Sequence, residues 1–67
     1  MSIARVTEVV SASPLGWKEA TDSGVARAAR TLRNITGVEV VEEKAKVEDG
    51  KIVEYRVRLN ITFILEG

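Results

Sequence analysis

The sequence contains neither cysteine nor histidine. A chain without these residues forms no disulfide framework and no thiolate metal centre, and it has no cysteine nucleophile. It also lacks the commonest general base and the imidazole ligand that zinc sites use. Aromatic residues are scarce, with one Trp, one Tyr and one Phe among 67 residues, so the core must be built from aliphatic side chains.

The charges are balanced, with ten Lys and Arg against ten Asp and Glu. A dedicated duplex-DNA binder or a polybasic membrane-surface module normally carries a basic excess. No stretch of the sequence approaches 18 consecutive apolar residues, and the first residues show no pattern typical of a signal peptide. We therefore expect a cytoplasmic protein with no nucleic-acid partner and no membrane partner.

The first half of the sequence predicts a strand followed by a helix. The β-branched run Ile3–Ser11 favours a strand. Ser13 is a suitable N-cap and Pro14 suits the first helical position, so we expect a helix from there to about Asn34. The residues at helical spacing that should form its packing face are Trp17, Ala20, Gly24, Ala28, Thr31 and Ile35. Most of them are small, which should allow the helix to approach a sheet closely.

The second half predicts a hairpin of two strands. Gly37 is a natural stop for the helix, and a second strand is expected over Val38–Val47. Asp49-Gly50 between two β-rich runs is a strong hairpin signal, because both residues tolerate positive φ. Strict alternation of apolar and polar residues then predicts a third strand over Val53–Leu65.

These elements define an α+β fold of β-α-β-β order in a single domain over residues 1–67. The returning helix makes the first two strands parallel, and the hairpin makes the third antiparallel to the second, so an antiparallel sheet requires the order 1-3-2. The sheet should wrap around the one helix. A strand of ~13 residues spans on the order of 43 Å, whereas a 20-residue helix spans about 30 Å. The uncovered part of the sheet should therefore meet other copies of the chain, since self-association is a common way to stabilise so small a domain.

Three segments carry a family resemblance: "SASP", which ends the first strand, the helix "ARAARTLRNI", and the final "EYRVRLNITFILEG". Together with the element order they make the whole chain resemble the dodecins. These are small β-α-β-β proteins that assemble as hollow homododecamers and bind flavins. The resemblance implies a homododecamer that binds and stores a small ligand, with riboflavin or FMN as the expected cofactor, and that is not an enzyme.

The resemblance also implies where a flavin would bind. In flavin-binding dodecins a Trp at the start of the second strand stacks on the flavin ring, a Gln of the third strand contacts the ring edge, and a basic residue of the second strand is associated with the phosphate. Gly37 and Arg56 stand at the first two positions, and Lys44 corresponds to the third. The expected cofactor-binding residues are Gly37, Val38, Lys44, Arg56 and Arg58. Loss of a stacking partner worth ~1–3 kcal/mol should weaken flavin binding roughly 10- to 100-fold.

A second reading of the sequence is a flavin-independent shell that binds calcium. The pattern Ser-Pro-x-x-Trp at residues 13–17, with no Trp after the helix, resembles the calcium dodecins. Calcium needs six to eight oxygen ligands, which one chain of this size does not supply, so copies around a symmetry axis would have to share it. The expected metal ligands are Glu42, Glu43 and Glu54. No paired carboxylates or nucleophile–base spacing point to catalysis.

Overall fold

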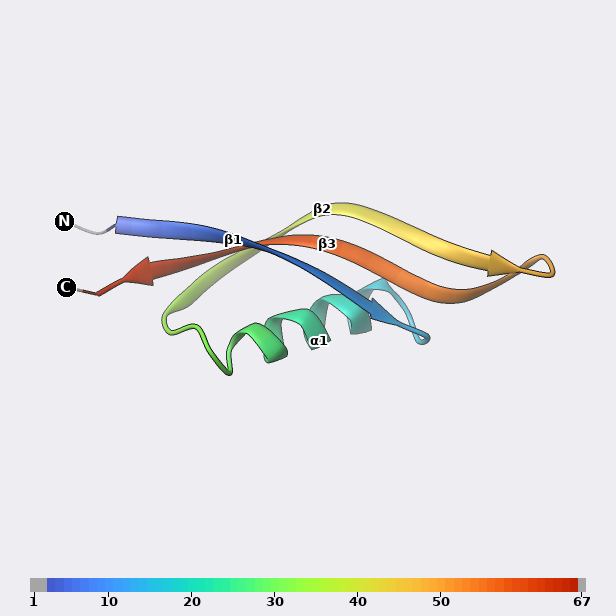
Figure 1. The fold of residues 1–67 in the computed structure, drawn as a ribbon, viewed down its shortest axis with the longest axis horizontal. Helices are drawn as coiled ribbons and strands as arrows, with labels where there is room; N and C mark the ends of the chain where they lie inside the picture. The colour runs from blue at the N-terminus through green and yellow to red at the C-terminus, as the bar shows by residue number, and fades with distance from the viewer. Residues whose placement is uncertain (1–2, 67) are drawn as a thin grey trace.

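The computed structural model describes residues 3–66, and Figure 1 shows one helix against one face of an open three-stranded sheet. The elements are β1 (Ile3–Ser13), α1 (Trp17–Ala28), β2 (Ile35–Glu48) and β3 (Lys51–Leu65). Both outer strands pair antiparallel to β3 in the order β1-β3-β2, which confirms the predicted β-α-β-β topology. Met1, Ser2 and Gly67, which belong to the expected domain 1–67, lie outside the described residues.

The helix is shorter at both ends than the sequence indicates. The predicted start at Ser13 and Pro14 is wrong, because Ser13 still pairs with β3 and its Oγ accepts a hydrogen bond from the backbone N–H of Leu15 at 3.0 Å. The hydroxyl thus closes a tight turn after β1 instead of capping the helix. The predicted end at Asn34 is wrong too, since α1 stops at Ala28.

The chain reverses into β2 at Asn34 and not at Gly37. Asn34 has a φ of 60°, in the left-handed region that Asn tolerates better than most residues. Gly37 lies inside β2, so its predicted role as the helix stop is also wrong. The hairpin prediction is confirmed, because Asp49 and Gly50 link β2 to β3 with φ values of 51° and 75°.

The core lies between α1 and the middle of β3. Val57, Leu59 and Ile61 alternate along β3 and are almost completely buried. The helix faces them with Ala20, Gly24 and Ala28, which confirms the predicted small-residue face over its helical part. Trp17, Leu32 and Ile35 pack around the edge of this cluster.

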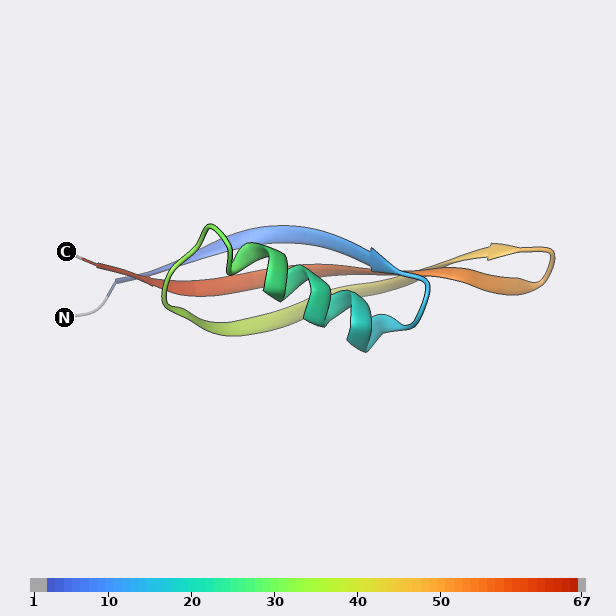
Figure 2. The same ribbon diagram turned by 90° about the horizontal axis from the view of Figure 1, so that it is seen from below.

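The helix covers only part of the sheet. Twelve helical residues span about 18 Å, while the fifteen residues of β3 span about 50 Å. The molecule accordingly measures 52 × 19 × 13 Å, and Figure 2 shows the hairpin of β2 and β3 running well beyond α1. Large apolar side chains remain exposed on both strands, namely Val38, Val40, Val41, Val47, Ile52 and Val53.

The ends of the described chain lie side by side at the other end of the sheet. Ile3 pairs with Leu65 in the register of β1 and β3 (Figure 1). Within residues 3–66, no helix has the length and apolar character that a membrane crossing requires.

Candidate functional site

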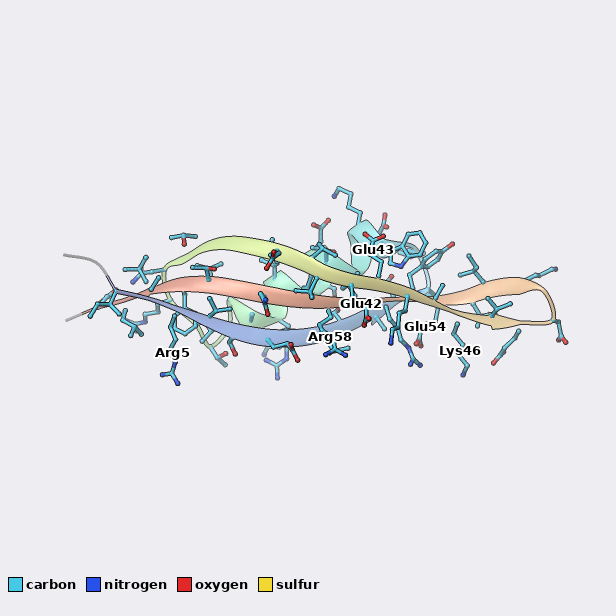
Figure 3. The ribbon with its side chains drawn as sticks, turned by 90° about the horizontal axis from the view of Figure 1, so that it is seen from above. Arg5, Glu42, Glu43, Lys46, Glu54 and Arg58 are labelled. Carbon is cyan, nitrogen blue, oxygen red and sulfur yellow. The ribbon has the colours of Figure 1, made fainter. Side chains whose placement is uncertain are left out.

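The sheet has an outer face, defined here as the face turned away from α1. Alternation along β3 places Glu54, Arg56, Arg58, Asn60 and Thr62 on this face, because Val57, Leu59 and Ile61 point to the helix. Pairing of the strands then sets Glu42 of β2 opposite Arg58 and Lys44 opposite Arg56. Figure 3 shows Glu42, Glu54 and Arg58 gathered near the middle of the sheet.

A hollow lies among these side chains, with a volume of about 150 Å³. Its lining residues are Val10, Glu42, Lys44, Arg56, Val57 and Arg58. A neighbouring hollow is lined by Lys44, Ala45, Lys46 and Arg56. Lys44 and Arg56 therefore lie between the two hollows and line both. Three cationic groups and one carboxylate line the first hollow, and Glu8 and Glu54 pair with its arginines, so an anionic ligand would have to replace carboxylate partners there.

Ion pairs cross all three strands on this face. Arg58 lies 3.7 Å from a carboxylate oxygen of Glu8 on β1 and 3.7 Å from one of Glu42 on β2. Lys44 lies 3.4 Å from Glu42, and Arg56 pairs with Glu54. These side chains are about half exposed, where single ion pairs contribute little to stability. Separating one of these pairs would therefore cost little free energy.

The structure separates the five predicted cofactor-binding residues into two places. Lys44, Arg56 and Arg58 line the hollow. Gly37 lies opposite Thr62 on the outer face, seven residues and roughly 20 Å along β2 from Lys44. Val38 lies opposite the buried Ile61, on the face that carries the helix. One chain therefore does not bring all five residues to a single ligand.

Gly37 is open to solvent on its side-chain side. A Cβ atom built there would meet no atom within 4 Å, and the residue has no positive φ. The position would accept a large side chain without disturbing the chain. The expected flavin site consequently lacks a ring-stacking wall here but has the space for one.

The three predicted metal ligands do not come together. Glu42 and Glu54 lie on the outer face, whereas Glu43 lies opposite Val57 and so belongs to the helix side of the sheet. Figure 3 shows Glu43 apart from Glu42 and Glu54. Across residues 3–66, no three carboxylates are close enough to hold a metal ion.

Two residues of β1 belong to the site but were missed by the sequence reasoning. Val10 lies opposite Arg58 and lines the hollow, and Glu8 pairs with the Arg58 guanidinium. The two residues are spaced by two, so they share a face of the strand. The 1-3-2 strand order, which places β1 beside β3, was the signal that could have found them.

Taken together, the fold and this site define a small α+β protein whose sheet carries an open hollow lined by paired charges. The family model for dodecin matches residues 3–66. The chain belongs to the dodecin family.

Relatives of known structure or sequence agree with this assignment. The solved structure of dodecin from Streptomyces coelicolor is 39% identical with a TM-score of 0.93, covering 98% of this chain and 94% of that one. Dodecin of Thermus thermophilus is 33% identical over 64 residues, which is 96% of this chain and 93% of that protein. Calcium dodecin of Mycobacterium tuberculosis is 29% identical over 63 residues, or 94% and 89% of the two chains. Its crystal structure, described as having a calcium-binding site, has a TM-score of 0.83 over 97% of this chain and 93% of that one.

Proposed function

We propose that this protein is a dodecin-type hollow homododecamer that binds and stores a small ligand without catalysing a reaction. The observation that carries the proposal is the hollow around Lys44, Arg56 and Arg58, which one chain leaves incomplete. Ligand pockets usually enclose about 300–1,000 Å³; this hollow offers about 150 Å³ and the adjoining one about 310 Å³, and both are open to solvent in one chain. Other copies of the chain would supply the missing walls.

The surface of the single chain supports self-association. It exposes 4990 Å², whereas a folded monomer of this mass exposes roughly 4,200 Å². The excess of about 800 Å² reflects the extended shape of the chain, and it is of the same order as the area that one partner buries in a standard protein interface. Val38, Val40 and Val41 on the edge strand β2 contribute apolar area to this excess.

The ligand we propose is a flavin, with FMN preferred over riboflavin. The phosphate of FMN would interact with Lys44 and the arginines of the hollow, which form charge-assisted hydrogen bonds to phosphate. Because Gly37 and Lys44 of one chain lie roughly 20 Å apart, the flavin ring would have to meet Gly37 of a neighbouring copy, and a glycine there gives the ring no stacking partner. We therefore expect binding roughly 10- to 100-fold weaker than in a site that has one.

The number of subunits in the assembly tests whether the protein forms the proposed shell. Native mass spectrometry of protein purified without added flavin should show a sharp species of twelve subunits, and any retained flavin would add its own mass. A chain that stays monomeric or dimeric at micromolar concentration would contradict the proposal.

The ligand is tested by titrating FMN and riboflavin while following flavin fluorescence. Gly37→Trp should tighten binding of both flavins about 10- to 100-fold, because it supplies a stacking wall worth ~1–3 kcal/mol at a position with room for it. Gly37→Leu is the matched control, since it adds apolar bulk but no aromatic ring. An unchanged titration for Gly37→Trp, or an equal gain for Gly37→Leu, would refute this placement of the ring.

The alternative is a calcium-binding shell that does not use flavin. Its support is the likeness to calcium dodecin of Mycobacterium tuberculosis across 94% of this chain. Glu42 and Glu54 of several copies would have to meet around a symmetry axis, because the described part of one chain gathers no three carboxylates.

A further inference from the structure

Trp17 makes an unusual connection between the helix and the far strand of the sheet. It is the first residue of α1, which otherwise packs mainly on β1 and β3. Its indole Nε1 donates a hydrogen bond of 2.9 Å to the backbone carbonyl of Lys44 on β2. The sequence suggests only a packing role for this residue, and packing alone does not require the indole N–H.

Tyr55 holds the indole in place. The two rings meet edge to face with their centroids 4.9 Å apart and their planes at 80°. Tyr55 lies on β3 opposite Ala45, the residue after Lys44. The ring contact and the hydrogen bond therefore join α1, β2 and β3 at one point, just before the hairpin leaves the cover of the helix.

The strand needs such an anchor at this point. β2 is an edge strand, so β3 supports it from one side only. Its pairing with β3 is irregular on both sides of Lys44, with register shifts between Val40 and Glu42 and between Lys46 and Val47. Edge segments flanked by irregular pairing open more readily than regular central strands.

The side chain of Lys44 is the part of this residue that could contact a ligand. While its carbonyl bonds to Trp17, its side chain lies on the outer face and lines the hollow with Arg56. We propose that Trp17 is a positioning residue, which fixes the backbone of β2 at Lys44 and thereby holds the Lys44 ammonium ready for the anionic group of the ligand. The ligand part of this inference rests on the proposed function, whereas the anchoring part does not.

The test replaces the indole N–H and little else. Incorporation of 3-benzothienylalanine at position 17 keeps the bicyclic ring but puts sulfur in place of the N–H. Trp17→Phe is a simpler variant that removes the N–H together with one ring and so also weakens packing against Tyr55. Amide hydrogen exchange over residues 43–46 should speed up about two- to tenfold in both, as loss of one ordinary hydrogen bond allows. Exchange in the middle of β1 should stay unchanged.

The second readout is the ratio of the dissociation constants of riboflavin and FMN. Both variants should raise the dissociation constant of FMN several-fold and leave that of riboflavin unchanged, because only the FMN phosphate would interact with Lys44. In a Lys44→Met background the same replacement of Trp17 should no longer change the ratio. Leu32→Ala, which loosens the core away from Lys44, is the control that should lower the melting temperature without moving the ratio.

The outcomes of these measurements separate the anchoring of β2 by Trp17 from the positioning of Lys44 for a ligand. Unchanged exchange over residues 43–46 would overturn the anchoring role, whatever the flavins do. Faster exchange with an unchanged ratio would show that Trp17 supports the strand but does not position Lys44, which overturns the inference. If the unaltered protein binds neither flavin, the flavin proposal fails, and exchange over residues 43–46 alone decides the anchoring part.

Discussion

At the scale of single residues, Gly24 sets how closely the helix approaches the sheet. A Cβ atom at this position would lie 2.9 Å from Cδ1 of Leu59 and 3.1 Å from Cβ of Ser11. The Leu59 methyl group can shift, but the Cβ of Ser11 is fixed to the backbone of β1. The absence of a side chain at Gly24 therefore lets α1 lie against both β1 and β3.

Gly24→Val should consequently destabilise the protein by about 1–3 kcal/mol, the usual cost of forcing extra methyl groups into a packed core. Ala26→Val is the matched control, since Ala26 is exposed on the same helix and the change there costs only a few tenths of a kcal/mol in helix propensity. Urea unfolding at equal subunit concentration measures both. Equal stabilities for the two variants would mean that the helix moves away from the sheet at little cost.

At the scale of elements, the sequence predicts the strands better than the helix. The unbroken alternation over residues 53–65 and the Asp49-Gly50 turn are local signals that no tertiary contact overrides, and both are confirmed. The signals at Ser13-Pro14 and Gly37 are ambiguous, because Ser and Pro also form turns and Gly also fits a strand. Asn34, which reverses the chain, gives a weaker sequence signal than Gly37.

Only part of the candidate site carries a local signal in the sequence. Alternation alone puts Arg56 and Arg58 on one face. An uninterrupted two-residue hairpin would set Lys44 opposite Tyr55, on the helix side; the register shift between Lys46 and Val47, which no local signal predicts, sets it opposite Arg56. Gly37 and Val38 do not join them, because seven residues of an extended strand carry the chain roughly 20 Å. A site assembled from several copies leaves no local pattern in the sequence of one of them.

At the scale of the whole molecule, the length of 52 Å and the short helix leave much apolar surface that a single chain does not bury. The outer face adds charges in pairs and not in an excess of one sign. A surface of this kind would suit the proposed contacts between identical chains, because exposed apolar area and balanced charges let like surfaces meet without repulsion.

Calcium removal distinguishes the two proposed shells at this scale. Calcium at a hundredfold excess over its dissociation constant would stabilise the folded state by about 2.7 kcal/mol per site, a shift of many degrees for so small a domain. If the shell is the flavin-binding one, exhaustive dialysis against a chelator should leave the melting temperature and the subunit number unchanged, because no site in it depends on calcium. A lower melting temperature that calcium restores and magnesium does not would favour the calcium shell.

The pairing of Ile3 with Leu65 has one more consequence. Because the described chain starts and finishes at neighbouring points, a short peptide linker would close it into a ring. The backbone could then be cut at the solvent-exposed Asp49-Gly50 turn to give a circular permutant in which every strand keeps its neighbours. New ends made there would emerge at the tip of the hairpin, some 50 Å from the old ones, so the same fold offers two widely separated attachment points for a fused peptide.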